Sequence, residues 1–219
     1  MEIKIISEKN TILNQFLLEI RDENIQRDSM RFRRNMERIG EIMAYEISKQ
    51  LQYSEKEVVT SLGIANVIVP NEKPVLATIL RAGLPLHQGL LNYFDGCDSS
   101  FISAYRKYSK DGTFKIELEY ITCPNLDERT LILCDPMLAT GSSMVLAYNS
   151  LLKNGKPLHT HIVTIIACKD GINYMQKHLF GKNITIWAAA VDEELTVKSY
   201  IIPGLGDAGD LAYGMKEHN

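Results

Sequence analysis

Five short apolar runs constrain the fold of this chain of 219 residues more than any other feature. They are VLATIL (75–80), FISAY (101–105), LILC (131–134), HIVTIIAC (161–168) and ITIWAAAV (184–191), and turn or helical segments separate them. Strands that are apolar throughout are typical of a parallel sheet whose two faces are both covered. The runs therefore predict an α/β domain with a central, mostly parallel sheet flanked by helices.

Two amphipathic helices are expected ahead of the first run, in an N-terminal helical region of about residues 9–53. Apolar residues recur there at helical spacing in two stripes, from Ile12 to Ile20 and from Phe32 to Leu51. The second helix also carries five arginines: Arg27, Arg31, Arg33, Arg34 and Arg38. Since glutamates are interleaved with them, we interpret these arginines as a solvated helix face; a subunit contact or an anionic-ligand site is the alternative.

A β-hairpin is expected between the second and third runs, over about residues 105–122. The triplet Lys110-Asp111-Gly112 marks its turn, and apolar and polar residues alternate from Phe114 to Tyr120. Such a half-exposed hairpin can form a hood over a ligand site. The chain ends in a glycine-rich tail, about residues 200–214, and the stretch from Pro203 to Asn219 is unsuited to a strand or a long helix. We expect these parts to form a single domain of residues 1–219.

Charge and cysteine content exclude several classes of protein. A net charge of −3 and a pI near 6.0 argue against a broad nucleic-acid or membrane-binding surface. No apolar run approaches the ~18 residues that a membrane span needs, and the N-terminus lacks the apolar core of a signal peptide. The four cysteines form no CxxC pair, so we expect reduced thiols and a cytoplasmic location. The five histidines lack metal-site spacing, and His159 and His161 are expected on the surface.

The stretch LILCDPMLATGSS, residues 131–143, combines a buried strand with a phosphate-binding turn. Residues 135–139 form the turn after the strand, and residues 140–143 occupy the first turn of an amphipathic helix. Backbone N–H groups at a helix N-terminus lack internal partners, and the helix dipole favours an anion there. Three hydroxyl side chains and the close approach that Gly141 permits suit one phosphate group.

The alternative interpretation is an ordinary helix cap, since Thr and Ser precede many helices that bind no ligand. Asp135 argues for a ligand, because its carboxylate lies at the strand tip, about a sugar's length from a phosphate bound at Thr140. There it can accept hydrogen bonds from vicinal hydroxyl groups. The chain has neither a Walker loop nor a GxGxxG fingerprint. The predicted ligand is a sugar phosphate held by another kind of motif.

These motifs resemble those of type I phosphoribosyltransferases, and CDPMLATGSS together with YIIPGLGDAGD resembles the uracil branch of that family. The resemblance runs from the arginine-bearing helix through ILRAGLPL and the hairpin to the tail, which is nearly the whole chain. It implies the type I phosphoribosyltransferase fold and transfer of a phosphoribosyl group from 5-phospho-α-D-ribose 1-diphosphate (PRPP) to uracil, giving UMP and diphosphate. The chain departs from the family pattern at Gly141-Ser142, where a Gly-Gly pair is usual, and in the hood after Arg106, which lacks the usual acid and proline.

The resemblance also implies roles for individual residues. Arg81 and Arg106 would bind the diphosphate, Asp135 would face the ribose hydroxyl groups, and Asp207 would touch both the sugar diphosphate and uracil; these four residues are the predicted catalytic set. A non-proline cis peptide is expected near Arg81-Ala82. The segment that would bind PRPP is Asp135, Pro136, Met137, Leu138, Ala139, Thr140, Gly141, Ser142 and Ser143. The residues that would read uracil, mainly through backbone atoms, are Ile201, Gly206, Asp207 and Ala208.

Mg²⁺ is the cofactor that the resemblance implies, held mainly by substrate oxygens rather than by protein ligands. Two other functions stay open: a regulatory protein of the same fold that senses PRPP and binds RNA or DNA, and a purine phosphoribosyltransferase. The acid-interleaved basic helix argues against the first, and the PGLGDAGD tail argues against the second. The expected partners are small-molecule substrates, with neither nucleic acid nor membranes. Because the N-terminal helices have more apolar positions than a peripheral hairpin needs, a homodimer or larger homo-oligomer is expected.

Overall fold

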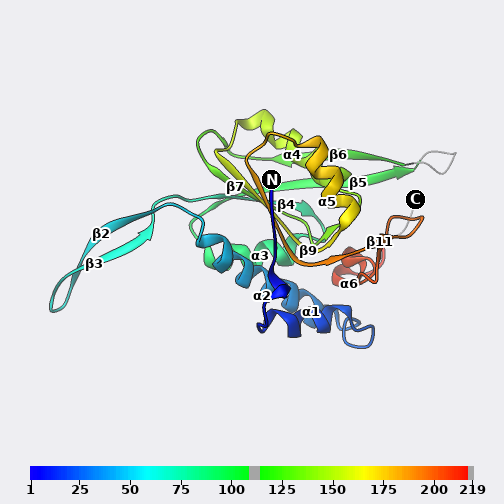
Figure 1. Ribbon diagram of the computed structural model, residues 1–219, viewed down its shortest axis with the longest axis horizontal. Helices are drawn as coiled ribbons and strands as arrows, with labels where there is room; N and C mark the ends of the chain where they lie inside the picture. The colour runs from blue at the N-terminus through cyan, green and yellow to red at the C-terminus, as the bar shows by residue number, and fades with distance from the viewer. Residues whose placement is uncertain (109–113, 217–219) are drawn as a thin grey trace.

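One eight-stranded sheet forms the centre of the protein (Figure 1). The computed structural model describes residues 1–108 and 114–216, and it leaves out the side chains of residues 105–117. The strand order is β1-β10-β9-β7-β4-β5-β6, with β8 paired to β9. The strands are β1 (Glu2–Ile5), β4 (Val75–Leu80), β5 (Asp98–Tyr108), β6 (Phe114–Thr122), β7 (Thr130–Cys134), β8 (Met137–Leu138), β9 (His159–Cys168) and β10 (Ile184–Asp192).

The sheet is parallel except at one edge. All five apolar runs are strands, and the central strands β7 and β9 are buried along almost their whole length. β6 pairs with β5 in antiparallel fashion and completes the predicted hairpin, which begins at Asp98 rather than near residue 105. The sequence does not predict β1, which adds a parallel strand beside β10. The predicted fold, a mostly parallel sheet with a hairpin and N-terminal helices, is confirmed.

Helices cover both faces of the sheet (Figure 1). α1 (Leu13–Arg21), α2 (Ser29–Ser48), α3 (Leu84–Tyr93) and α6 (Ala208–Tyr213) share one apolar core with the first face. α4 (Ser142–Leu151) and α5 (Lys169–His178) share a second core with the other face. Side chains on both sides of the central strands are therefore withdrawn from water, which explains why those strands are apolar at successive positions.

The N-terminal helices pack through their apolar stripes. The stripe of α2 is fully buried within the chain, whereas Ile12, the first residue of the other stripe, is 63% exposed. Between α1 and α2, the buried carboxylate of Glu19 accepts hydrogen bonds from Arg31 Nε at 2.9 Å and Nη2 at 2.8 Å. Asn35 donates to the same carboxylate at 2.6 Å. These contacts fix the angle between the two helices.

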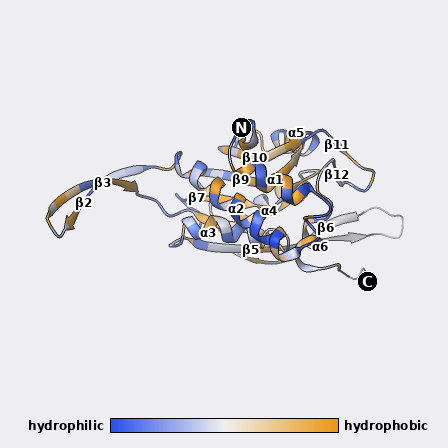
Figure 2. Cartoon of the chain, turned by 90° about the horizontal axis from the view of Figure 1, so that it is seen from below, coloured by the Kyte–Doolittle hydropathy of each residue, from blue (hydrophilic) through white to orange (hydrophobic). Residues whose placement is uncertain are grey.

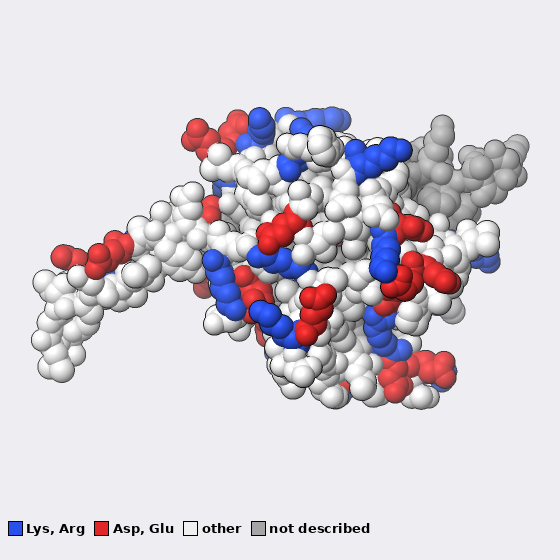
Figure 3. Space-filling view, in the orientation of Figure 1, with Lys and Arg blue, Asp and Glu red and all other residues white. Residues whose placement is uncertain are grey.

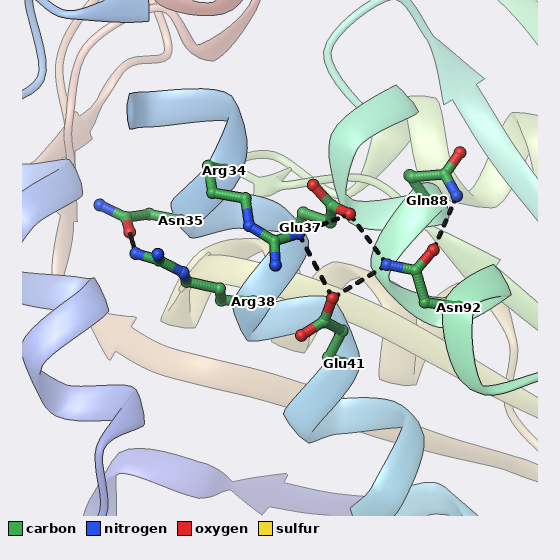
Figure 4. Close-up of polar contacts among 7 residues, drawn as sticks. All are labelled: Arg34, Asn35, Glu37, Arg38, Glu41, Gln88 and Asn92. Carbon is green, nitrogen blue, oxygen red and sulfur yellow. Dashed lines mark hydrogen bonds and ion pairs between the residues drawn. The ribbon is translucent and has the colours of Figure 1, made fainter. Parts of the chain in front are cut away.

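Arg31 and Arg34, the two exposed arginines of α2, pair with acids, whereas Arg33 donates to Ala212 O of α6. Arg34 lies 2.7 Å from Glu37 and 3.5 Å from Glu41, and Asn92 of α3 donates to both carboxylates (Figure 4). Gln88 in turn donates to Asn92 at 2.8 Å. Acidic and basic side chains are interspersed over the face that Figure 3 shows. This part of α2 is a solvated face that also links α2 to α3.

β2 (Tyr53–Thr60) and β3 (Gly63–Pro70) form a two-stranded antiparallel ribbon that projects away from the body of the protein (Figure 1). The ribbon does not join the central sheet. Its outer part is apolar (Figure 2), with Val59 84%, Leu62 98% and Ile64 69% exposed. The sequence does not predict this ribbon, because its strands lack the fully apolar pattern of the others.

Among the described residues, the peptide bonds Leu80–Arg81 and Ile202–Pro203 are cis. The first is the expected non-proline cis bond, and it lies one residue earlier than the predicted Arg81–Ala82. Within the same described part of the chain, no helix is long and apolar enough to cross a membrane.

Candidate active site

Two of the predicted site residues follow neighbouring strands at the same edge of the sheet. β4 and β7 pair in parallel, with Thr78 opposite Cys134. Arg81 and Asp135 come directly after these strands and so lie at their carboxyl ends. Ligands of open parallel sheets bind at this edge, because connecting loops and helix N-termini converge there.

The turn between β7 and α4 is held by its neighbours. Pro136 O accepts two backbone N–H groups of β9, at 3.1 and 2.9 Å, and β8 extends this pairing. Gly141 has a φ of +78°, and a β-carbon there would lie 2.6 Å from Gly171 O in α5. Only glycine combines that backbone angle with that approach. The turn is therefore fixed in place from both sides.

The N-terminus of α4, residues 140–143, is the predicted anion-binding cradle. Val145 N–H donates to Gly141 O at 3.0 Å, so the N–H groups ahead of it lack a carbonyl partner within the helix. The hydroxyl groups of Thr140 and Ser142 lie 2.7 Å apart, and Thr140 Oγ1 also accepts the first N–H of the helix, that of Ser142, in a long hydrogen bond of 3.4 Å. Thr140, Ser142 and Ser143 are only partly buried. Phosphate binding here stays a prediction, which the N–H groups ahead of Val145 and the partly exposed hydroxyl groups support.

Asp135 occupies the predicted place between β7 and the cradle. Its backbone N–H donates to Val163 O at 3.0 Å, which ties the residue to β9, and the residue is half-buried. Of the residues that follow, Pro136 and Leu138 are buried, whereas Met137 and Ala139 are partly buried. A carboxylate thus stands at the strand tip on a backbone that neighbouring strands hold.

Arg81 is held by the C-terminal tail. Its Nη2 donates to Asp210 Oδ1 at 2.7 Å and to Gly214 O at 2.8 Å. Gly209, in the first turn of α6, approaches the same guanidinium group, since a β-carbon there would lie 3.6 Å from Arg81 Nε. The tail therefore lies directly against the arginine that follows β4. Reasoning from sequence misses Asp210, although the second acid of GDAGD is a signal that could have found it.

Asp207 caps α6 and binds a lysine. Its Oδ1 accepts Asp210 N–H at 3.0 Å, and its Oδ2 accepts Lys216 Nζ at 3.1 Å. Burial alone would raise the pKa of the Asp207 carboxyl group, but these two donors lower the pKa below its ordinary value. Asp207 is therefore ionised at neutral pH. Because a carboxylate has about four lone-pair sites, capping α6 leaves capacity for a ligand.

The other expected uracil contacts surround a turn at the start of the tail. Ile201 lies in β12 (Ile201–Ile202), which pairs with β11 (Glu194–Leu195). Ile201 and Ala208 are buried in the same core as α1 and α2. Gly206 is exposed with a φ of +93°, and a β-carbon there would meet nothing within 4 Å. Buried side chains thus anchor this segment, while its backbone at Gly206 is open to a ligand.

Three other residues lie at the carboxyl ends of strands. Arg106 lies on β5, and its side chain is outside the described part of the structure, so its contact with diphosphate stays a prediction. Lys169 and Asp170 follow β9 and open α5. Lys169 pairs with Glu193 at 2.6 Å, and both side chains are exposed. Where side chains are described, no group of three or more His, Cys, Asp or Glu residues is arranged to hold a metal ion.

The surface position expected for His161 is wrong. This residue is 2% exposed, and its Nδ1 accepts a hydrogen bond from Trp187 Nε1 at 3.0 Å. Burial, with the nearby His159 and Lys4, lowers the pKa of His161 to about 3, so the ring is neutral. The prediction fails because β9 is covered on both faces of the sheet. The Trp187 indole N–H gives His161 Nδ1 a hydrogen-bond partner, so this nitrogen can be buried without loss of its partner.

The fold and this edge of the sheet define a class of protein. In this open α/β sheet an acid and the predicted anion cradle follow β7, and a guanidinium group follows β4, the strand paired with β7. Such an arrangement is typical of α/β proteins that bind a phosphorylated ligand at the carboxyl ends of their strands.

Comparisons with known proteins give the family. The family model described as uracil phosphoribosyltransferase matches residues 7–215. A uracil phosphoribosyltransferase of Porphyromonas gingivalis is 54% identical over 216 residues, covering 99% of this chain and 100% of the relative. One from Methanothermobacter thermautotrophicus is 38% identical, covering 94% of this chain and 93% of the relative. A solved structure of an Aquifex aeolicus protein has a TM-score of 0.84 and 29% identity, covering 99% of this chain and 100% of that one. The chain belongs to the uracil phosphoribosyltransferase family.

Proposed function

We propose that the protein transfers the phosphoribosyl group of PRPP to uracil, giving UMP and diphosphate. The observation that carries this proposal is the contact between the glycine-rich tail and Arg81, made at 2.7 Å through Asp210. This contact supports a single site, formed by the tail and the end of β4, at which the base and PRPP lie side by side. Relatives with the name uracil phosphoribosyltransferase, matched over almost the whole chain, support uracil as the base.

Each part of the site has one task in this proposal. The cradle binds the 5-phosphate, and Asp135 accepts hydrogen bonds from the ribose hydroxyl groups. Arg81, with Arg106 from the hood, neutralises the diphosphate. Backbone atoms near Ile201, Gly206 and Ala208 read the edge of uracil, because glycine permits a flat ring to approach the chain closely.

The reaction needs no covalent protein nucleophile. A uracil nitrogen attacks the anomeric carbon of PRPP while the bond to diphosphate breaks, and the nitrogen then loses its proton. Alignment of the two reactants contributes up to about 7–11 kcal/mol in favourable cases. Positive charge beside the departing diphosphate lowers the barrier further. Its attraction for the diphosphate is stronger in a site from which water is excluded. Arg81 must exchange Asp210 for the diphosphate in order to supply that charge.

The residues at this edge fit Mg²⁺ carried by the donor. Magnesium usually keeps several waters and is bound by one or two carboxylates together with substrate phosphates. Asp135 and the ionised Asp207 are the carboxylates that would take part, and they are oxygen donors of the kind that the ion prefers. When bound, the ion would neutralise diphosphate charge.

A turnover assay tests the proposed function. Protein, Mg²⁺, PRPP and radiolabelled uracil are mixed, and labelled nucleotide is separated and counted; hypoxanthine competes as a purine control. We expect labelled UMP, undiminished by hypoxanthine. Asp135→Asn should lose most turnover and keep its melting temperature, since the change preserves shape and removes a charge at the strand tip. Failure of the wild-type protein to label uracil would refute the proposal.

The cysteines support a cytoplasmic location. All four have free thiols, and Cys134 and Cys168 are buried. Burial raises the pKa of Cys134 to about 12, so this thiol is protonated and unreactive. Free thiols persist in a reducing compartment. We therefore place the reaction in the cytoplasm, and an antibody against the folded protein in fractionated cells would test this.

Self-association through the β2–β3 ribbon is part of the proposal. An isolated two-stranded ribbon is marginally stable in water. Burial of the exposed side chains of Val59, Leu62 and Ile64 against a second copy would stabilise it. Lys56 lies on one face of the ribbon, whereas Glu55 and Glu57 lie on the other, because neighbouring residues of a strand point to opposite faces. Opposed ribbons of two copies can therefore match a basic face to an acidic one.

Sedimentation tests this assembly. We expect the wild-type mass to be that of a homodimer or a larger homo-oligomer. Replacing Val59, Leu62 and Ile64 by Ser should yield monomers without loss of the body of the fold, because the ribbon lies outside the central sheet. A monomeric wild-type protein, or an oligomer that survives the triple substitution, would contradict the proposal.

A further inference from the structure

An ion pair outside the expected substrate contacts joins distant parts of the chain. Arg21 is the last residue of α1, and Asp192 is the last residue of β10. Arg21 Nη1 and Nη2 lie 2.8 Å from the two different carboxylate oxygens of Asp192, which makes the pair bidentate. The side chain of Asp192 is 8% exposed and that of Arg21 is 25% exposed. The pair is therefore mostly shielded from water and keeps a defined geometry.

The same two side chains hold both backbone polar groups of Gly204. Gly204 N–H donates to Asp192 Oδ2 at 2.9 Å, and Gly204 O accepts from Arg21 Nη1 at 2.9 Å. Gly204 has a φ of +54°, and a β-carbon there would collide with Ile201 O. Glycine thus fixes the shape of this turn, while the ion pair fixes its place.

Gly204 lies among the residues expected to read the base. Ile201 is three residues earlier, and Gly206 and Ala208 follow two and four residues later. No helix or strand lies between Gly204 and Gly206. A shift of the turn at Gly204 would therefore carry the open backbone at Gly206 with it.

We propose that Arg21 and Asp192 are positioning residues for uracil recognition, which set the place of the base-reading backbone by gripping Gly204. This inference rests on the proposed function. Neither side chain needs to touch a substrate. Backbone groups must lie within hydrogen-bond reach of a base, and a misplacement of about 1 Å can cost ~10²-fold in rate. The cradle lies on α4, across the sheet from α1, so the loss should fall on uracil more than on PRPP, which the cradle also holds in the proposed function.

The chain offers a matched control on the same helix. Glu19 of α1 also has a side chain that is 8% exposed, and it also pairs with an arginine in bidentate fashion, at 2.9 and 2.8 Å. Its partners are Arg31 and Asn35 on α2 and Gln15 on α1 itself, and none of these bonds involves the tail. Glu19→Gln should therefore lower stability as Asp192→Asn does, without moving Gly204.

Initial rates with uracil and PRPP varied separately test the inference. We expect Asp192→Asn to raise the KM for uracil about tenfold and to change the KM for PRPP by less than about twofold. Arg21→Lys keeps the charge but loses the fork that bonds both Asp192 and Gly204, so it should shift the same constant in the same direction. Glu19→Gln should leave both constants within about twofold of wild type while lowering the melting temperature.

The outcomes separate this inference from the proposed function. Absence of uracil turnover by the wild-type protein would refute the function itself. An active wild type with an unchanged KM for uracil in both Arg21→Lys and Asp192→Asn would refute the positioning role alone. An equal rise in the Glu19→Gln variant would also overturn it, because a general loss of stability would then explain the effect. If Asp192→Asn fails to fold, the KM for uracil of Arg21→Lys decides whether the positioning role holds.

Discussion

Removing the charge of Asp210 should strengthen the binding of diphosphate. In the structure Arg81 Nη2 donates to Asp210 Oδ1 at 2.7 Å, so under the proposed function an incoming diphosphate must displace this carboxylate from Arg81. Asp210→Asn preserves the shape of the side chain and removes the negative charge. The variant should therefore bind diphosphate without first breaking an ion pair.

The exposure of the pair sets the size of the effect. The side chains of Arg81 and Asp210 are 37% and 26% exposed, so solvent weakens their attraction. Pairs of this kind contribute about 0.2–1 kcal/mol. Since about 1.4 kcal/mol corresponds to a tenfold change in affinity, the dissociation constant should fall by up to about fivefold. The gain should shrink at high salt, because salt screens the pair that is being removed.

Titration calorimetry with inorganic diphosphate and Mg²⁺, without uracil, measures this effect at low and high salt. Glu193→Gln is the matched control, since Glu193 lies at the same edge of the sheet and pairs with Lys169 rather than with Arg81. It removes one negative charge as well, but it frees no group that is expected to bind diphosphate. Unchanged or weaker binding by Asp210→Asn, or an equal gain in Glu193→Gln, would refute the reasoning.

Two further predictions concern the cradle and the N-terminal helices. Gly141→Ala should lower stability by about 1–3 kcal/mol and weaken PRPP binding, because its β-carbon would lie 2.6 Å from Gly171 O. Gly181→Ala is the control, since Gly181 has a similar φ of +75° and open space around it. Equal effects of the two substitutions in melting and PRPP titrations would contradict the role of the contact with Gly171. Hydrogen bonds from Arg31, then from Asn35 and Gln15, lower the pKa of Glu19 from 4.5 to about 2, so the stability from this group is present above pH 4.5 and lost as the pH falls toward 2. Melting curves between pH 6 and 3 should show a shallower loss in Glu19→Gln than in wild type, and parallel curves would contradict this.

The parts of the fold that the sequence predicts are those with a strong local pattern. The five apolar runs predict their strands because a doubly covered parallel sheet needs apolar residues at successive positions. The strand, the acid and the hydroxyl-rich helix start are predictable for a similar reason, since all three lie within residues 131–143. By contrast, β1 has four residues, too few for any periodicity, and it is defined only by its pairing with β10.

Contacts between distant segments are the parts that local patterns leave out. Arg81 and Asp210 are 129 residues apart, and Arg21 and Asp192 are 171 residues apart. Any of the chain's 24 basic residues could pair with any of its 27 acids, so the choice of partner follows from the fold rather than from spacing. His161 shows the same limit, because its burial depends on a hydrogen bond from Trp187 on the neighbouring strand.

The bond from Arg21 to Gly204 spans 183 residues, and this has a consequence for synthesis on the ribosome. The first helix emerges from the ribosome early. Arg21 on this helix can bond to Gly204 only after almost the entire message has been translated. A nascent chain that has reached the end of β10 already contains the cradle, but it lacks the loop that would hold a pyrimidine. If the proposed function holds, translation that stopped there would leave a product that has the residues for the 5-phosphate and lacks those for the base.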